Sequence, residues 1–215
     1  VVGCGCNAIT WLFNKGIQGA TVYGVNTDAL HLSVTKADEK LLIGKELTRG
    51  LGAGGKPKVG REAAKEAMAD LKRAVVGADM VFVLAGMGGG TGTGAAPVIA
   101  QLAKETGAVV IGVVTMPFES ERARIDKAEF GLQELREVTD TSIVLDNNRL
   151  VDIAGQLPIE QAFAVANELV STMVKGIVET ITLPSLINLD YADVSTIMKN
   201  GGVAVIGIGE SDTAG

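Results

Sequence analysis

Glycine in this sequence is gathered into separate groups rather than spread along the chain. The first group is Gly3 and Gly5, the second lies within residues 50–55, and the third is the run Gly88–Gly94. Clustered glycine marks places where a backbone turns sharply or comes close to another group. The 28 glycines among 215 residues are about twice the usual share of roughly 7%. The three groups are therefore candidate ligand-contacting loops.

Strand and helix patterns alternate between these glycine groups. Runs rich in β-branched residues predict buried strands at residues 22–25, 80–85, 109–114 and 142–145. Apolar residues spaced by three and four predict helices at residues 7–14, 61–75, 95–105 and 125–138. This alternation predicts an α/β fold, a three-layer parallel sheet with helices on both faces, whose ligands bind at the carboxyl ends of the strands. All three glycine groups can reach that edge, so we expect one nucleotide-sized ligand to touch them.

A longer helical pattern follows Pro158 and keeps one apolar stripe to about Ile181. A helix of that length crosses a domain and connects what lies on either side. We therefore divide the chain into a ligand-binding domain at 1–158, a central connecting helix at 159–182, a loop with a following helix at 183–202, and the first strand of a truncated second domain at 203–215.

Composition excludes several classes of protein. At 47% hydrophobic residues the chain can bury a core, so it is not predicted to be disordered. Its 19 basic and 25 acidic groups argue against binding of nucleic-acid backbones, which needs clustered cations. No apolar run reaches the roughly 18–20 residues of a membrane span and no leader pattern is present, so we expect a cytoplasmic protein without direct membrane insertion. Cys4 and Cys6 are too close for a disulfide and too few for zinc, and reduced thiols are expected.

The run Gly88–Gly94 is the strongest candidate for a phosphate site. It contains five glycines and two threonines, follows the strand at 80–85 and leads into a helix that is expected to begin near Ala95. Backbone N–H groups and hydroxyls at a helix N-terminus bind anions well. A simple turn would need only one or two glycines, so we predict phosphate binding here.

The other two glycine groups leave alternatives open. Residues 50–57 come close to the P-loop pattern, but Pro57 stands where a magnesium-binding Ser or Thr is required. Lys56 can still meet a phosphate, and a flexible surface loop is the other interpretation. Gly3 and Gly5 match half of a dinucleotide fingerprint without its third glycine. Asp28 could bind ribose hydroxyls, so this end of the chain alone leaves an oxidoreductase possible.

With these residues together, the sequence resembles the tubulin/FtsZ family of GTPases. The G-G-G-T-G-T-G run carries the resemblance, which extends through residues 26–29, 51–55, 115–118 and 186–193 and covers essentially the whole chain. The resemblance implies binding of GTP and GDP, with Mg²⁺ held through the phosphates. It also implies GTP hydrolysis and head-to-tail assembly into filaments of a cell-division ring. Other division proteins and membrane tethers are implied partners; nucleic acid is not.

The resemblance also implies roles for individual residues. Phe163 and Asn167 match guanine contacts, and their spacing puts a ring and an amide on one side of the predicted helix. Asn147 matches a third base contact, and Glu121 and Arg124 match ribose and phosphate contacts. The remaining implied nucleotide contacts are Gly5, Cys6, Asn7, Asn26, Asp28, Ala53, Gly54, Gly55, Gly88, Gly89, Gly90, Thr91, Gly92, Thr93, Gly94 and Pro117.

Hydrolysis is expected to depend on two carboxylates near the end of the chain. Asp190 and Asp193 lie three residues apart, so a helix that begins at Tyr191 would hold both near its N-terminus. Capping by Asp190 is the structural alternative. The resemblance implies that both polarise the attacking water or a cation beside it, and it places Asn188 in the same catalytic group. A regulatory relative that binds nucleotide without hydrolysing it is the competing function.

The predicted central helix separates these carboxylates from the base contacts. From Asn167 to Ile181 the chain advances 14 residues, or roughly 21 Å of helix. Asp190 and Asp193 are therefore expected to act on the nucleotide of a neighbouring subunit, through a heterologous head-to-tail contact.

The chain departs from the family pattern in two loops, either because the protein has shorter loops or because the sequence omits residues that are present in the molecule. The first phosphate loop is about three residues short, because Gly5 is followed directly by Cys6 and Asn7. The loop between Phe118 and Arg124 is about one residue short and lacks a glycine after Glu121.

Overall fold

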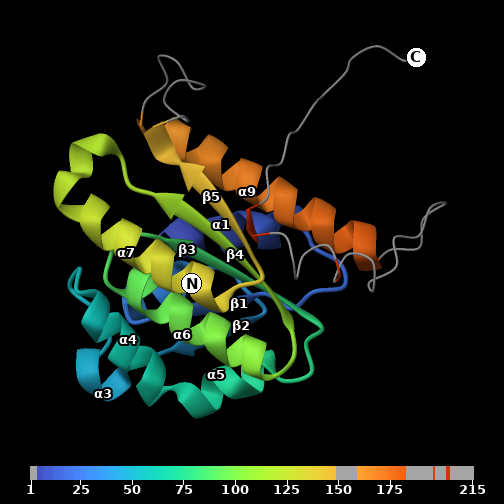
Figure 1. Cartoon of the computed structure of the whole chain (residues 1–215), viewed down its shortest axis with the longest axis horizontal. Coiled ribbons are helices and arrows are strands. Elements are labelled where there is room, and N and C mark those ends of the chain that lie inside the picture. The colour runs from blue at the N-terminus through green and yellow to red at the C-terminus, as the bar shows by residue number, and fades with distance from the viewer. Residues whose placement is uncertain (1–3, 149–158, 183–195, 197–201, 204–215) are drawn as a thin grey trace.

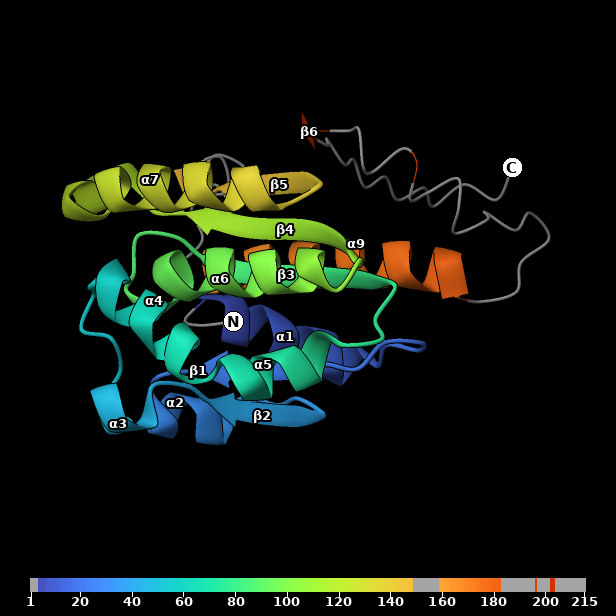
Figure 2. The same ribbon diagram turned by 60° about the horizontal axis from the view of Figure 1, so that its bottom comes forward.

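The computed structural model describes residues 4–148, 159–182, 196 and 202–203. Parallel strands form a middle layer, with helices on both of its faces (Figures 1 and 2). The α/β architecture predicted from the sequence is therefore confirmed. The residues outside these ranges include Asn188, Asp190 and Asp193.

The described strands form two parallel sheets instead of one continuous sheet. β1 (Tyr23–Asn26) pairs with β2 (Glu39–Leu42). The larger sheet has the order β3-β4-β5-β6, formed by β3 (Met80–Gly86), β4 (Val109–Met116), β5 (Thr141–Asp146) and β6 (Gly202–Val203). β4, whose first six residues are all buried, is a central strand of this sheet. The hydrophobic pattern of the sequence did not predict β2, because Glu39 and Lys40 are exposed at the outer edge.

The helices follow the strands in the order that a parallel sheet requires. They are α1 (Cys4–Lys15), α2 (Ala29–Val34), α3 (Lys45–Thr48), α4 (Pro57–Glu66), α5 (Met68–Val75), α6 (Thr91–Glu105), α7 (Arg122–Val138) and α9 (Ile159–Thr182), with a short 3-10 turn at Glu119–Glu121. The single helix expected at 61–75 is two helices, because the backbone of Ala67 leaves the helical region between α4 and α5. α6 begins at Thr91, inside the glycine run and before the expected start near Ala95.

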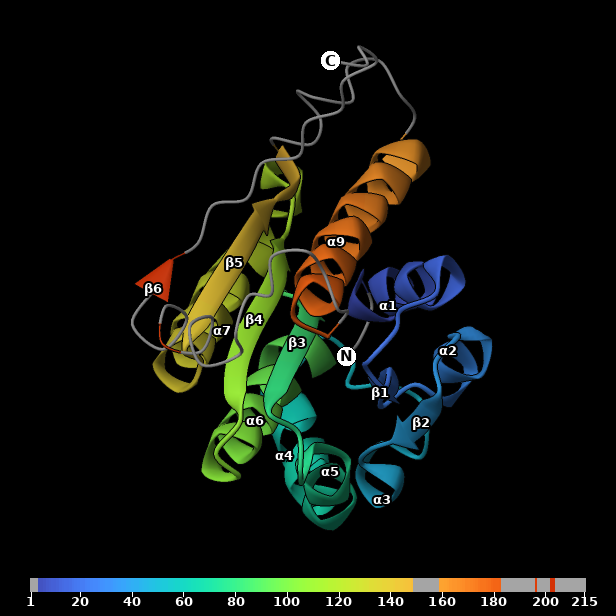
Figure 3. The ribbon, with the colours of Figure 1, turned by 90° about the vertical axis from the view of Figure 1, so that its right-hand side faces the viewer.

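Two apolar cores hold the layers together. One lies between the sheet and the helices α4 to α7, and the other lies under α1 and α9 on the opposite face. α1 and α9 pack side by side (Figure 3), where Ser171 Oγ donates to the carbonyl of Ala8 at 3.0 Å. Among the described residues, no helix is both long and apolar enough to cross a bilayer.

α1 packs unusually close to β3. A Cβ atom at Gly5 would lie 2.6 Å from the carbonyl oxygen of Leu84, a separation that real Cβ atoms do not show. Glycine is therefore required at this position for the helix to rest on the strand.

Candidate nucleotide-binding site

A cavity of about 570 Å³ opens at the carboxyl ends of β3 and β4. Its volume falls in the usual range of small-molecule sites, roughly 300–1,000 Å³. The residues expected from the sequence that line it are Ala53, Gly55, Gly89, Gly90, Thr91, Gly92, Pro117, Glu121, Arg124, Asn147 and Phe163. Three separate segments, the loop at 53–55, the glycine run and the start of α9, therefore meet at one place.

Sequence reasoning missed several lining residues. These are Gly86, Met87, Thr115, Met116, Phe118 and Ser120. Gly86 and Met116 end β3 and β4, so the rule that ligands bind at the carboxyl ends of parallel strands could have found them.

Other expected residues lie away from the cavity lining. These are Gly5, Cys6, Asn7, Asn26, Asp28, Gly54, Gly88, Thr93, Gly94 and Asn167. Gly5, Cys6 and Asn7 belong to the first turns of α1, which begins at Cys4. Cys6 is a free thiol with no exposed surface, and its Sγ lies 3.9 Å from the carbonyl oxygen of Val25.

The polar residues after β1 are held by local hydrogen bonds. Asp28 caps α2, since its Oδ1 accepts from the backbone N–H of His31 at 2.9 Å. Asn26 is fully buried, and its Oδ1 accepts from the backbone N–H of Asp28 at 3.0 Å. These contacts stabilise the loop rather than aim its side chains into the cavity.

The glycine run forms a tight turn that aims backbone groups at the cavity. Gly88 adopts a φ of 91°, and its N–H donates to Thr93 Oγ1 at 2.9 Å. α6 begins at Thr91, so its first backbone N–H groups lie where intrahelical partners are missing. The N-terminal end of this 15-residue helix also carries a partial positive charge. The turn can therefore bind an anionic group such as a phosphate.

Not every glycine of the run faces the ligand space. A Cβ at Gly90 would lie 2.8 Å from both Ala53 Cβ and the backbone nitrogen of Lys56, so this glycine lets the loop at 53–56 approach. A Cβ at Gly94 would overlap the carbonyl oxygen of Pro57. A Cβ at Gly60 of α4 would likewise overlap the carbonyl oxygen of Gly90. By contrast, a Cβ at Gly89 would meet nothing within 4 Å. The run therefore combines helix packing with ligand access.

The cavity is also lined by an aromatic pair and by an amide whose oxygen has no hydrogen-bond partner among the described residues. The rings of Phe118 and Phe163 meet edge to face, with centroids 5.3 Å apart and an interplanar angle of 71°. Asn147 is 4% exposed, and its Oδ1 has no hydrogen-bond partner among the described residues. A buried acceptor without a partner costs free energy, and a ligand N–H would remove that cost.

Charged side chains at the rim pair with one another. Arg124 Nη1 contacts Glu121 Oε2 at 2.6 Å, and Glu121 Oε1 accepts from the backbone N–H of Phe118 at 3.3 Å. Across the cavity, Lys127 Nζ donates to the carbonyl of Gly55 at 3.0 Å and ties α7 to the loop at 53–55.

A buried hydroxyl pair joins the loop after β1 to the start of α6. Thr27 Oγ1 and Thr91 Oγ1 are 2.6 Å apart, and the carbonyl of Thr27 also accepts from the N–H of Gly52 at 3.1 Å. Thr27 therefore links three loops around the cavity.

We expect Thr27→Val to lower the free energy of unfolding by about 1–3 kcal/mol, because it leaves the buried hydroxyl of Thr91 without this partner. Thr27→Ser keeps the hydroxyl and is expected to cost less than about 1 kcal/mol. Urea unfolding of the two variants measures the difference. Equal midpoints for Val and Ser would contradict this role of the hydroxyl pair.

Known proteins resemble the chain in sequence. The family model described as "Tubulin/FtsZ family, GTPase domain" matches residues 1–155. "Cell division protein FtsZ 2" of Methanocaldococcus jannaschii is 57% identical over 217 residues, covering 100% of this chain and 57% of the relative. "Cell division protein FtsZ 1" of Thermococcus kodakarensis is 55% identical over 214 residues, covering 99% and 57%. The chain thus spans 57% of the length of each of these two relatives.

Solved structures resemble it in fold as well. The structure titled "FtsZ dimer, empty (M. jannaschii)" matches with a TM-score of 0.94 and 52% identity, covering 99% of this chain and 62% of the other. "CetZ from Methanosaeta thermophila" matches with a TM-score of 0.76 at 23% identity over 93% of this chain and 58% of the other, a likeness of fold alone.

Proposed function

This chain belongs to the Tubulin/FtsZ family, and on that premise we propose that it is the nucleotide-binding part of a self-assembling GTPase of cell division. The protein binds GTP in the cavity at the ends of β3 and β4 and hydrolyses it to GDP and phosphate. Its copies assemble head to tail into cytoplasmic filaments of a division ring, with other division proteins and membrane tethers as partners.

The convergence of groups of opposite character in one cavity carries this proposal. The turn at Gly88–Gly94 and the N-terminus of α6 favour negative charge. Phe163 and Asn147, whose Oδ1 has no partner among the described residues, line the same cavity and offer an aromatic edge and a hydrogen-bond acceptor. A nucleoside phosphate combines both requirements, because its phosphates are anionic and its base is planar and polar.

We propose that Asn147 favours guanine over adenine. Its Oδ1 has no partner among the described residues, and guanine offers it two adjacent donors, a ring N–H and an exocyclic amino group, whereas adenine offers an amino group beside a ring nitrogen that is an acceptor. Asn167 lies one helical turn beyond Phe163 and is 6% exposed, so we propose it as a second base contact reached when the nucleotide is bound.

Mg²⁺ is proposed to bind through the phosphates. No cluster of three His, Cys, Asp or Glu side chains that could hold a metal occurs within residues 4–148 and 159–182 or the other described positions. Thr91 lines the cavity beside the phosphate turn, and its hydroxyl is paired with that of Thr27, so we propose that phosphate oxygens supply the cation's main ligands.

The length of α9 supports a catalytic site that is shared between two subunits. Phe163 lines the cavity, and α9 continues 19 residues further to Thr182, which carries the chain about 28 Å away. Asn188, Asp190 and Asp193 follow this end. We propose that they complete the site of the next subunit, where the carboxylates orient the attacking water.

We expect the protein to bind GTP more tightly than ATP, and Asn147→Ala to weaken GTP binding about 5- to 150-fold, the equivalent of about 1–3 kcal/mol for one hydrogen bond to a buried group. ATP affinity should change little. Fluorescence titrations with both nucleotides test this, with Asn14→Ala as a matched surface control, since Asn14 lies on the exposed side of α1. Equal affinity of the unaltered protein for GTP and ATP would overturn the proposed specificity.

A further inference from the structure

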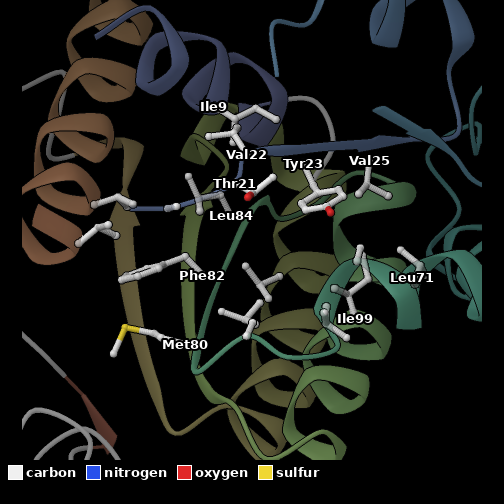
Figure 4. Close-up of a pocket in the computed structure, with 18 of the residues that line it drawn as sticks. Ile9, Thr21, Val22, Tyr23, Val25, Leu71, Met80, Phe82, Leu84 and Ile99 are labelled. Atoms are coloured by element: carbon white, nitrogen blue, oxygen red, sulfur yellow. The ribbon is translucent and has the colours of Figure 1, made fainter. Parts of the chain in front are cut away.

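β3 borders two cavities that differ in chemistry. One, of about 420 Å³, lies beside residues 80–84 and is lined mostly by aliphatic and aromatic side chains, among them Val22, Phe82 and Leu84 (Figure 4). The other is the candidate nucleotide site, which begins at Gly86 and is lined by several glycines. Backbone N–H groups bind phosphates, whereas an aliphatic lining leaves a charged group without partners. Of these two cavities, the second is therefore suited to phosphates, and its affinity depends on where its backbone N–H groups are held.

A tight turn at residues 53–56 carries two backbone donors beside this cavity. The N–H of Lys56 donates to the carbonyl of Ala53 at 3.1 Å, and Gly54 and Gly55 between them have φ values of 58° and 69°. Positive φ at both central positions is typical of a type I′ turn. The N–H groups of Gly54 and Gly55 have no hydrogen-bond acceptor among the described residues, and Gly55 lines the cavity. Both groups are therefore available to an anionic ligand.

The 53–56 turn lies between the glycine run and α7. On one side, a Cβ at Gly90 would lie 2.8 Å from the Cβ of Ala53 and 3.2 Å from its carbonyl oxygen. On the other side, Lys127 Nζ donates to the carbonyl of Gly55 at 3.0 Å. Within the part of the chain that the structure describes, no other hydrogen bond reaches the turn from outside the turn and α4. Lys127 thus makes the polar link between the turn and α7.

α7 is a fixed base for this lysine, because it packs closely on the glycine run. A Cβ at Gly88 would lie 3.0 Å from the carbonyl oxygen of Arg124, and a Cβ at Gly131 would overlap the methyl group of Thr93. Arg124, Lys127 and Gly131 are spaced by three and four residues, so they lie on the same face of the helix. Lys127 therefore reaches the turn from the helix face that touches the glycine run.

We propose that Lys127 is a positioning residue of the GTP site. Its bond to Gly55 keeps the 53–56 turn beside the glycine run, so that the N–H groups of Gly54 and Gly55 are in place before the phosphates bind. A loop that is already ordered loses less conformational entropy on binding, so the bond raises affinity through the loop. This role rests on the GTP binding proposed above.

The test compares Lys127→Met with the unaltered chain. Without nucleotide, we expect the NMR order parameters of the Gly54 and Gly55 amides to fall from about 0.85, the value of a rigid backbone, to below about 0.6. GTP affinity should fall about 2- to 10-fold, the usual effect of losing one hydrogen bond. Lys127→Arg keeps a cationic donor and should restore both quantities to nearly their unaltered values.

Lys40→Met is the matched control. Lys40 Nζ also donates to a backbone carbonyl, that of Ser33 at 2.9 Å, but Lys40 lies in the exposed part of β2 and outside the lining of the nucleotide cavity. This variant should change neither the order parameters of the 53–56 turn nor the affinity for GTP.

The possible results separate this role from its alternatives. The inference is wrong if the turn stays rigid in Lys127→Met, or if GTP affinity falls equally in both methionine variants. A fall in affinity with a rigid turn would show that Lys127 contacts the phosphates directly, which also overturns a positioning role. If the unaltered chain does not bind GTP, the proposed function fails, and the order parameters still decide whether Lys127 holds the turn.

Discussion

The variant Gly94→Ala is expected to be strongly destabilised, because the added methyl group has no space between α4 and α6. It would overlap the carbonyl oxygen of Pro57 and lie 2.7 Å from the backbone nitrogen of Arg61. Both atoms belong to a helix backbone, which cannot give way as a flexible side chain can. Overpacking of this kind costs about 3 kcal/mol or more, a large part of the roughly 5–15 kcal/mol that stabilises a typical domain.

Gly89→Ala is the matched variant within the same run. Its added Cβ would meet no atom within 4 Å, so the fold should persist. Because Gly89 lines the cavity, the methyl group should occupy space needed by a phosphate, and GTP affinity should fall about tenfold or more. Gly94→Ala should therefore lower the unfolding temperature, whereas Gly89→Ala should weaken GTP binding alone.

Circular dichroism with thermal unfolding and a GTP titration together separate the two effects. Gly176→Ala in α9 is a further control, because its Cβ also meets nothing within 4 Å. Alanine is the better helix former by about 0.8–1 kcal/mol, so this variant should be as stable as the unaltered protein or more so. If Gly94→Ala unfolds at the same temperature as Gly89→Ala, the packing role of Gly94 is wrong.

The second large effect concerns hydrolysis in the whole protein. Asp193→Ala should still bind GTP but turn it over at least about a hundredfold more slowly, because the carboxylate that orients the water is gone. If the site is shared between subunits, turnover per subunit in the unaltered protein should also rise with concentration. Turnover at a constant rate per subunit would contradict a shared site.

Mixing two inactive variants gives the sharpest test of whether the catalytic site is shared between subunits. Asp193→Ala retains its own nucleotide site, and Gly89→Ala retains its carboxylates. In random head-to-tail filaments of equal parts, roughly a quarter of the contacts pair an intact nucleotide site with intact carboxylates. Recovery of activity on mixing supports hydrolysis by the neighbour, whereas a mixture as inactive as its components argues for catalysis within one chain. Unaltered protein that binds GTP without any turnover would instead favour the non-hydrolysing regulatory relative.

Local patterns predicted most elements but not their interruptions. The β-branched runs found β3, β4 and β5 to within two residues at each end, because central strands are apolar on both faces. The break between α4 and α5 at Ala67 was missed, since alanine is a strong helix former and nothing local marks a turn there. The sequence predicted a single sheet, whereas the described strands form two sheets. This difference depends on which strands pair with each other.

The residues of the candidate site could also be predicted only in part from the sequence. The sequence singled out the glycine run, and the resemblance added Asn147 and Phe163, all of which contribute to the cavity lining. The sequence could not separate Gly89, which faces the ligand space, from Gly94, which faces Pro57. The helix expected at 7–14 includes Asn7, but the sequence did not predict that Gly5 and Cys6 also lie within α1.

The sequence by itself determined the α/β alternation, the glycine-rich turn and the family, because these depend on residues that are near neighbours along the chain. Only the tertiary structure decided which glycines bring backbones together, that Thr27 meets Thr91, and that the oxygen of Asn147 has no partner among the described residues. Each of these depends on the distance between segments far apart in sequence. Such distances are set by the packing of whole helices and strands, which no local pattern encodes.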